Sequence, residues 1–256
     1  MTRKKHTDHA RNYRKNVTHS QAETSFQVVV EQTDLFIIAE RDLSVEAAAI
    51  IHEVRSIIKA HMLINPLFGT SLAPVQVPEG ADPVILAMAK AATLCGVGPM
   101  ATVAGAVAQA VATRLAPLSE NIIVENGGDI YMNSTTPRTV ALLSDPDSGS
   151  QIALKIDTKE FPVAICSSSG NIGHSLSLGS GDLVTVRSKD ARLADAAATA
   201  LANHLQSPAD VPLVIEKART LSEQLTKSGT KYGLDGVFVQ YDSKIGAWGE
   251  IELIAL

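Results

Sequence analysis

After the basic N-terminal residues, the chain has two short runs of apolar residues. They cover Ser25–Val30 and Leu35–Ala39, and the polar segment Glu31–Asp34 lies between them. Two β-rich runs on either side of a polar turn are typical of a hairpin. The sequence therefore predicts that the fold begins with two antiparallel strands.

The apolar spacing then changes to that of a helix. Apolar side chains fall on one helical face up to about Met62, at Ala47, Ile51, Val54, Ile57 and Ile58. Ser44 precedes this pattern and is predicted to be the N-cap of the helix. A proline-punctuated loop is expected to follow, from Asn65 to Gly80.

Two more helices are predicted before the middle of the chain. Asp82-Pro83 has the order of a cap and a first-turn proline, and Gly96–Pro99 is a stop signal. The segment Met100–Arg114 that follows consists almost entirely of Ala, Val, Gly and Thr. Because such small side chains let backbones approach closely, we expect this helix to lie in the centre of the molecule.

The second half changes to short β-rich runs separated by turns. Predicted strands cover Asn121–Glu125, Ile130–Met132, Thr139–Leu143, Gln151–Ile156, Val163–Cys166, Leu183–Val186, Val237–Tyr241 and Ile251–Leu256. One helix is predicted to begin after Asp190, its N-cap, and to end near Leu205. Another is predicted over Val214–Leu225. This order predicts an α+β protein with a largely antiparallel sheet flanked by helices, formed as a single domain by residues 21–256.

Length and composition agree with a globular protein. With 256 residues and 45% hydrophobic content, the chain can bury a core of one large domain. Cys95 and Cys166 match no zinc or CxxC spacing and are interpreted as reduced core thiols. The apolar stretch Val97–Leu118 is broken by proline and polar residues, so a buried helix is expected there instead of a membrane span. Since no apolar run of an export signal follows the basic N-terminus, a cytoplasmic location is expected.

Charge is distributed unevenly. Residues 1–20 carry six basic side chains and one acidic one, Asp8, which gives this segment a net charge of +5. Because the whole chain has a net charge of −5, the other 236 residues sum to −10. We predict a basic, partly disordered N-terminal arm over residues 1–20. An acidic body with 4% aromatic residues lacks the features of a nucleic-acid binder, and no nucleic-acid partner is expected.

A glycine pair lies between two of the predicted strands, in Asn126-Gly127-Gly128-Asp129. Asn-Gly is a strong signal for a type I′ hairpin turn, and an ordinary turn is one interpretation. The other is functional, because two glycines leave backbone N–H groups open to a phosphate or a sugar.

Hydroxyl-bearing residues and glycines follow the strand that ends near Cys166. The loop runs from Ser167 through Ser169, Gly170 and His174 to Ser180 and offers many hydrogen bonds to anionic oxygens. A flexible surface loop is the alternative. Gly173-His174-Ser175-Leu176-Ser177 is also similar to the nucleophile elbow of serine hydrolases, although no helix is predicted to follow it as that elbow requires.

Asp195, Thr199 and Asn203 recur every fourth residue and so share one stripe of a predicted helix. A solvated face would explain the stripe, but the flanking positions are almost all alanine, which favours close packing. A carboxylate beside a hydroxyl is a suitable pair of oxygen ligands for Mg²⁺. Asp195 and Thr199 are therefore candidate magnesium ligands.

Taken together, three segments resemble the ApbE flavin transferase superfamily. They are Asn126–Asp129, Ser169-Gly170 after a strand, and Ala194–Ala200. The resemblance implies an ApbE-like fold, a metal bound by Asp195 and Thr199, and an enzyme that splits FAD and attaches FMN to a Thr or Ser of an acceptor protein. A closer resemblance, over nearly the whole chain, is to an intracellular branch of that superfamily, from which no reaction is carried over.

One departure from the transferases matters. They have a K-G-x-A-x-D pattern before the glycine turn, whereas this chain has Ala104 and Gln109 in place of the lysine and the aspartate. Phosphoryl chemistry depends on such charged groups.

Two hypotheses follow from this sequence. In one, a Mg²⁺-dependent FMN transferase or FAD-cleaving enzyme uses His174, Ser169 and Ser175 for chemistry. In the other, the protein binds a flavin or nucleotide without turnover. In both, the ligand is expected to contact Asn126, Gly127, Gly128, Asp129, Ser169 and Gly170.

Overall fold

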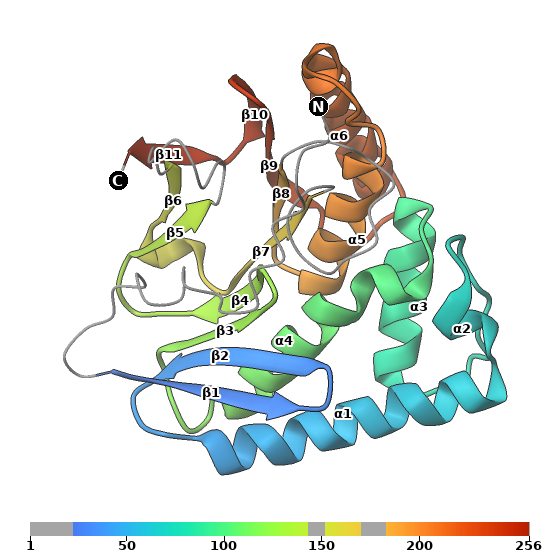
Figure 1. The fold of residues 1–256 in the computed structure, drawn as a ribbon, viewed down its shortest axis with the longest axis vertical. Coiled ribbons are helices and arrows are strands. Elements are labelled where there is room, and N and C mark those ends of the chain that lie inside the picture. The colour runs from blue at the N-terminus through green and yellow to red at the C-terminus, as the bar shows by residue number, and fades with distance from the viewer. Residues whose placement is uncertain (1–22, 143–151, 170–182, 256) are drawn as a thin grey trace, which may run out of the picture.

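The computed structural model describes residues 23–142, 152–169 and 183–255, and its elements are labelled in Figure 1. The helices are α1 (Ser44–Ile64), α2 (Leu67–Thr70), α3 (Pro83–Cys95), α4 (Val103–Leu115), α5 (Ala191–Ala202) and α6 (Val211–Lys227). Short 3₁₀ helices are η2 (Pro99–Thr102), η3 (Thr158–Glu160) and η4 (Pro208–Asp210). The strands are β1 (Thr24–Val30), β2 (Thr33–Ala39), β3 (Ile122–Asn126), β4 (Asp129–Asn133), β5 (Arg138–Leu142), β6 (Ile152–Ile156), β7 (Val163–Ser168), β8 (Leu183–Ser188), β9 (Leu234–Tyr241), β10 (Lys244–Gly249) and β11 (Glu252–Ala255).

One large sheet organises the molecule. Its eight strands have the order β1-β2-β3-β4-β7-β8-β9-β10, and each neighbouring pair is antiparallel. A three-stranded antiparallel sheet has the order β11-β6-β5. The predicted α+β class with a largely antiparallel sheet flanked by helices is confirmed.

The helices cover one face of the large sheet. In sequence order, α1 contacts β1, α4 contacts β3 and β4, α5 contacts β7 and β8, and α6 contacts β9 and β10 (Figure 1). The main hydrophobic core lies between these layers, and Leu35, Ile51, Val111, Val124 and Val186 are among its fully or almost fully buried members. Helix α4, with its small side chains, lies in the middle of this layer, as its composition predicts.

The other face of the large sheet packs on the small sheet. A second core joins Met132, Ile165 and Phe238 of the large sheet to Leu142 and Leu154 of the small one. Because side chains alternate between the faces of a strand, Ile130 and Met132 point to this second core while Asp129 and Tyr131 point to the helices. Because of this alternation, the side chain of Asp129 lies on the face of the sheet that the helices cover.

Several element boundaries differ from the sequence predictions. Ser44 is not the N-cap of α1: the cap is Leu43, without a side-chain bond, and Asp42 accepts a hydrogen bond from the N–H of Ser44 at 2.8 Å. The segment after Pro99 begins as η2, so α4 starts at Val103 and not at Met100. By contrast, Asp82 caps α3 as predicted, and Gly96 ends it in the left-handed conformation at a φ of 70°.

The basic arm predicted for residues 1–20 lies outside the described residues. Within the part of the chain that is described, no single helix is long and apolar enough to cross a membrane. The bent pair formed by α3 and the segment Pro99–Leu115 passes that test of length and composition, with an angle of 103° between its two halves. Both halves bury side chains in the protein core.

Candidate functional site

The glycine pair forms the tight turn between β3 and β4. Asn126 pairs with Asp129, and Gly127 and Gly128 between them have φ values of 69° and 106°, the two positive angles that a type I′ turn requires. Nothing lies within 4 Å of the Cβ position of either glycine, so the turn presents bare backbone to its surroundings. The N–H of Gly128 donates to Oε1 of the buried Glu125 at 2.8 Å.

Asp129 directly follows the turn and is buried, with 4% of its surface exposed. Its Oδ1 accepts a hydrogen bond of 3.1 Å from the N–H of Ser167 on β7. Burial is the main cause that raises the pKa of Asp129 to about 7; the bonds from Ser167 and Cys166 oppose the rise, and the charge of Glu125 adds to it. This carboxyl group is therefore held where ionisation is costly.

Asp195 extends from α5 to the first turn of α4. Its Oδ2 accepts a hydrogen bond of 2.9 Å from the N–H of Gly105, at the helix end where backbone N–H groups have no partner within the helix. Thr102, the N-cap of α4, provides no side-chain bond, so Asp195 takes over that role from another helix. Burial first, and the charge of Asp129 second, raise the pKa of Asp195 above its usual range.

Helices α4 and α5 are in close contact at Gly105. A Cβ on Gly105 would lie 2.2 Å from the carbonyl oxygen of Ala191 and 3.1 Å from Cβ of Asp195, so only glycine fits this position. In the other direction, Oε1 of Gln109 on α4 accepts a hydrogen bond of 2.8 Å from the N–H of Ala191 at the start of α5. Each helix thus supplies a side-chain acceptor for the N-terminus of the other.

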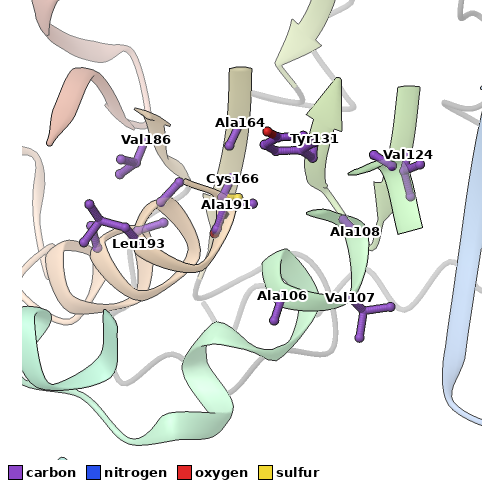
Figure 2. Close-up of a cluster of buried hydrophobic side chains, with 14 of the residues drawn as sticks. Ala106, Val107, Ala108, Val124, Tyr131, Ala164, Cys166, Val186, Ala191 and Leu193 are labelled. Carbon is purple, nitrogen blue, oxygen red and sulfur yellow. Dashed lines mark hydrogen bonds between the residues drawn. The ribbon is translucent and has the colours of Figure 1, made fainter. Parts of the chain in front are cut away.

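The glycine turn is tied to the same place. Nδ2 of Asn126 donates to the carbonyl oxygen of Ala104 at 3.1 Å, one residue before the N–H that Asp195 binds. Figure 2 shows the neighbouring packing, in which Cys166 of β7 lies against Ala191 of α5, and its thiol donates to the Ala191 carbonyl at 3.5 Å. The Asn126–Asp129 turn, the start of α4 and the Asp195 turn of α5 therefore converge on the helix-covered face of the sheet. We call this region the α4–α5 junction.

The serine-rich loop is described only at its start. Ser167 and Ser168 end β7, Ser169 follows them, and the N–H of Ser167 reaches Asp129 of the junction. The hydroxyl of Ser167 points to the other face, where it shares a hydrogen bond of 2.9 Å with Thr185. Gly170, His174 and Ser175 lie outside the described residues, and so does the nucleophile-elbow alternative.

The donor set at the junction suits Mg²⁺. The carboxyl group of Asp195, which accepts backbone hydrogen bonds from Gly105 and Ala104, shares one helical stripe with the hydroxyl of Thr199, one turn later on α5. Both are hard oxygens, and Mg²⁺ is usually held by one or two carboxylates, with water and substrate phosphate completing its shell. No cluster of three or more His, Cys, Asp or Glu that could hold a metal occurs among residues 23–142, 152–169 and 183–255. The pair fits a metal bound jointly with a ligand.

The cysteines contribute no reactive group to the junction. Cys166 is buried and Cys95 is half-buried, and both are free. Burial raises the pKa of the Cys95 thiol to about 12 and that of Cys166 well above its usual range, so neither forms the thiolate that reaction requires. The interpretation of both as reduced thiols agrees with this, although Cys95 is less enclosed than predicted.

Gly105 and Gln109 are site residues that the sequence did not single out as such. In the sequence Gln109 is a departure from the transferase pattern, and in the structure its side chain orients the helix that carries Asp195. A separate groove of about 260 Å³ lies along α3 and is lined by Val77, Leu86, Lys90 and Thr93 among others. None of the junction residues lines that groove.

Comparison with known proteins identifies the family. A family model described as "AbpE bacteria" matches residues 16–227. The chain belongs to this ApbE-like family. Its relatives include a UPF0280 protein of Methanococcus maripaludis, 40% identical over 197 residues, which cover 75% of this chain and 76% of the relative. A UPF0280 protein of Methanopyrus kandleri is 40% identical over 206 residues, covering 79% and 82%.

Solved structures show the same ApbE-like fold. The apo form of the flavinyl transferase ApbE of Pseudomonas stutzeri matches with a TM-score of 0.52 at 12% identity, over 88% of this chain and 93% of that one. The flavin transferase ApbE of Vibrio cholerae has a TM-score of 0.49 at 14% identity, over 88% and 96%. At such low identity the likeness concerns the fold, and this ApbE-like chain is distant from the flavin transferases.

Proposed function

We propose that this ApbE-like protein binds a flavin or another nucleotide through its phosphates, together with Mg²⁺, at the α4–α5 junction. One observation carries the proposal: Asp129 and Asp195, from segments far apart in sequence, lie close enough for the charge of Asp129 to disfavour ionisation of Asp195, and burial disfavours ionisation of both. A divalent cation removes that repulsion, and a cation bound by carboxylates is the usual bridge to a phosphate.

The surrounding residues have complementary roles in this proposal. Asp195 and Thr199 would hold the metal, which would neutralise charge on the phosphate oxygens. The bare turn of Gly127 and Gly128 lets phosphate or ribose approach the backbone closely, since no side chain stands in the way. Asn126 fixes this turn to α4, so the turn and Asp195 keep one relative position.

The first form of the proposal includes catalysis. The chain would split the pyrophosphate of FAD, transferring FMN to a Ser or Thr hydroxyl of an acceptor protein and releasing AMP. His174, Ser169, Ser175 and Gly170 would contact the reacting groups. The names of the solved relatives support this form, because they describe flavin transferases.

A second form, binding without turnover, is favoured by a different observation. Gln109 stands where the transferases have an aspartate, and its side-chain oxygen is already engaged by the N–H of Ala191. Ala104 stands where they have a lysine and offers no cation. Both positions serve the packing of the two helices here, and neither is left to stabilise a transferring phosphoryl group.

Two assays separate these forms. Incubation of the full chain with FAD and Mg²⁺, with and without candidate acceptor proteins, is expected to release AMP if catalysis takes place. Calorimetric titration with FAD, FMN and ADP in Mg²⁺ reports binding alone. Micromolar binding without AMP supports the second form, and absence of binding by all three ligands refutes both.

A further inference from the structure

We propose that Arg187 and Asp235 form a pH-dependent latch on the connection between β10 of the large sheet and β11 of the small one. The chain makes this passage through Glu250 and Ile251 (Figure 1). Arg187 holds the connection while Asp235 carries its proton and releases it when Asp235 ionises. The inference is independent of the proposed function, because none of these residues belongs to the α4–α5 junction.

One buried guanidinium group fastens two connections between the sheets. Arg187 lies on β8, and its side chain is 4% exposed. Its Nη1 donates to the carbonyl oxygen of Glu250 at 2.7 Å, and its Nη2 donates to Oε2 of the same residue at 3.0 Å. Nη2 also donates to Oε1 of Glu160 at 2.7 Å, in the connection from β6 to β7. A single side chain of the large sheet therefore holds both the β6–β7 and the β10–β11 connection.

A β-bulge places Asp235 beside this guanidinium group. Arg187 pairs with Gly236, whereas the next residue, Ser188, pairs with Leu234. Asp235 is therefore an extra residue on β9, opposite Arg187 and Ser188. Bulges of this kind redirect a side chain out of the regular alternation of a strand.

The connection between β10 and β11 packs closely on Asp235. The N–H of Glu250 donates to the carbonyl oxygen of Asp235 at 2.8 Å. A Cβ on Gly249 would lie 2.2 Å from that same oxygen, and the φ of Gly249 is 79°, so glycine is required there. A change at Asp235 is therefore felt directly by the connection.

Two buried polar atoms of this cluster have no hydrogen-bond partner in the part of the chain that the structure describes. They are Nε of Arg187, which is a donor, and Oδ2 of Asp235, which is an acceptor. A buried polar atom without a partner is costly, and the cost is far higher for an ionised carboxylate than for a neutral carboxyl group. Ionised Asp235 therefore needs a donor, and the unused N–H of Arg187 is one that the cluster offers.

The charges around Asp235 balance only while it is neutral. Burial is the main cause that raises the pKa of Asp235. The charges of Arg187 and Lys189 oppose the rise, and those of Glu250 and Glu160 add to it. These neighbours carry two positive and two negative charges, so ionisation of Asp235 leaves the cluster with a net charge of −1.

The new carboxylate competes with Glu250 for Arg187. The side chain of Glu250 is 69% exposed, and ion pairs of exposed groups contribute little free energy, so Glu250 is the partner that Arg187 gives up. Because the pKa of Asp235 is raised, the closed form keeps its proton at pH values where an ordinary aspartate has lost it. The latch is therefore closed at low pH and opens as the pH rises through this pKa.

Trp248 provides a direct readout of the latch. It is the single tryptophan of the chain, lies on β10 two residues before Glu250 and packs half-buried on the main core. Quenching of its fluorescence by acrylamide measures its exposure, from acidic to mildly alkaline pH, while circular dichroism reports whether the full chain stays folded. In the wild type, the quenching constant is expected to rise in one step as the pH rises.

Three variants assign that step. Asp235→Asn keeps the shape of the carboxyl group but cannot ionise, so it is expected to lose the step and to remain weakly quenched at every pH. Arg187→Met removes the latch and is expected to be strongly quenched at every pH. Asp242→Asn is the matched control, since Asp242 is exposed in the turn between β9 and β10 and the step should stay unchanged.

Each other outcome overturns the inference. A wild-type profile without a step shows that no latch opens. A step that persists in Asp235→Asn, or that disappears in Asp242→Asn, assigns the titration to another group. If Arg187→Met does not fold, the comparison of the wild type with Asp235→Asn still decides between the latch and its absence.

Discussion

Asp195 on α5 closes the N-terminus of α4 by accepting a hydrogen bond of 2.9 Å from the N–H of Gly105. A helix N-terminus has a partial positive charge and unpaired N–H groups, and a carboxylate satisfies both. Here the carboxylate comes from a residue 90 positions away in sequence. The same carboxyl group is one of the metal ligands that we propose, so it would serve both the end of α4 and a bound ligand.

Gly105→Ala is expected to destabilise the protein. The added Cβ would lie 2.2 Å from the carbonyl oxygen of Ala191, and backbone on that side cannot move without shifting α5. We expect a loss of about 1–3 kcal/mol in the free energy of unfolding, or more, measured by urea denaturation. Gly80→Ala is the control, because nothing lies within 4 Å of its Cβ position. Equal stability of both variants would contradict the close helix contact.

Gln109→Leu is expected to cost about 1–3 kcal/mol, since it leaves the N–H of Ala191 without its acceptor. Leucine has a helix propensity similar to that of glutamine, so the helix itself should not be weakened. Gln224→Leu, at an exposed position of α6, is the matched control and should be neutral. Urea denaturation of the three proteins measures the effect, and a neutral Gln109→Leu would show that the bond to Ala191 is unimportant.

Stability should fall as pH rises because of Asp129. The native group, with a pKa of about 7, keeps its proton at pH values where the unfolded group, near 3.8, has lost it. The native state therefore binds more protons between these values, and its stability decreases from about pH 4 to pH 7. The full loss is on the order of 4 kcal/mol, since one pKa unit corresponds to about 1.4 kcal/mol.

Asp129→Asn removes this ionisation. In EDTA, the variant is expected to unfold at a higher temperature than the wild type at pH 8, while at pH 4 the difference should largely vanish. Thermal unfolding followed by circular dichroism across this pH range measures it. Parallel pH profiles of the two proteins would refute the buried position of this carboxyl group.

Thr199→Val tests the metal site without disturbing the fold. Its hydroxyl has no hydrogen-bond partner within the described residues, so its loss should leave thermal stability unchanged. A hydrogen bond or ligand contact to a charged group contributes about 1.5–3 kcal/mol, so Mg²⁺-dependent affinity for FAD should fall roughly tenfold or more. Thr220→Val on α6 is the control, as that hydroxyl bonds only to the carbonyl of Glu216. Calorimetry that finds equal affinities would remove Thr199 from the site.

Local signals in the sequence were sufficient for much of the fold. The Asn126-Gly127 pair predicted the turn between β3 and β4, and Asp82 and Gly96 marked both ends of α3, because these residues act on their immediate neighbours. Strand β10 was missed, since Lys244–Gly249 is short, mostly exposed and contains two glycines. Its position follows from pairing with β9, which no local pattern reveals.

The sequence suggested candidate site residues, whose role stays a prediction, but it did not reveal the contacts that join them. The spacing of Asp195 and Thr199 indicated a shared helical stripe, and the carboxylate is indeed placed near Asp129. The bond from Gly105 to Asp195 and the bond from Ala191 to Gln109 join positions 90 and 82 residues apart. Such contacts depend on how α4 and α5 pack, and periodicity within either helix contains no information about that.

Crystals of the full chain grown with FAD and Mn²⁺ in place of Mg²⁺ give the most direct test of the account, because the anomalous signal of manganese locates the metal. We expect a single strong peak beside Asp195 and Thr199, with FAD phosphate oxygens next to the Gly127-Gly128 turn. A nucleotide bound elsewhere, for example in the groove beside Lys90, or crystals without metal and nucleotide at the α4–α5 junction, would contradict it.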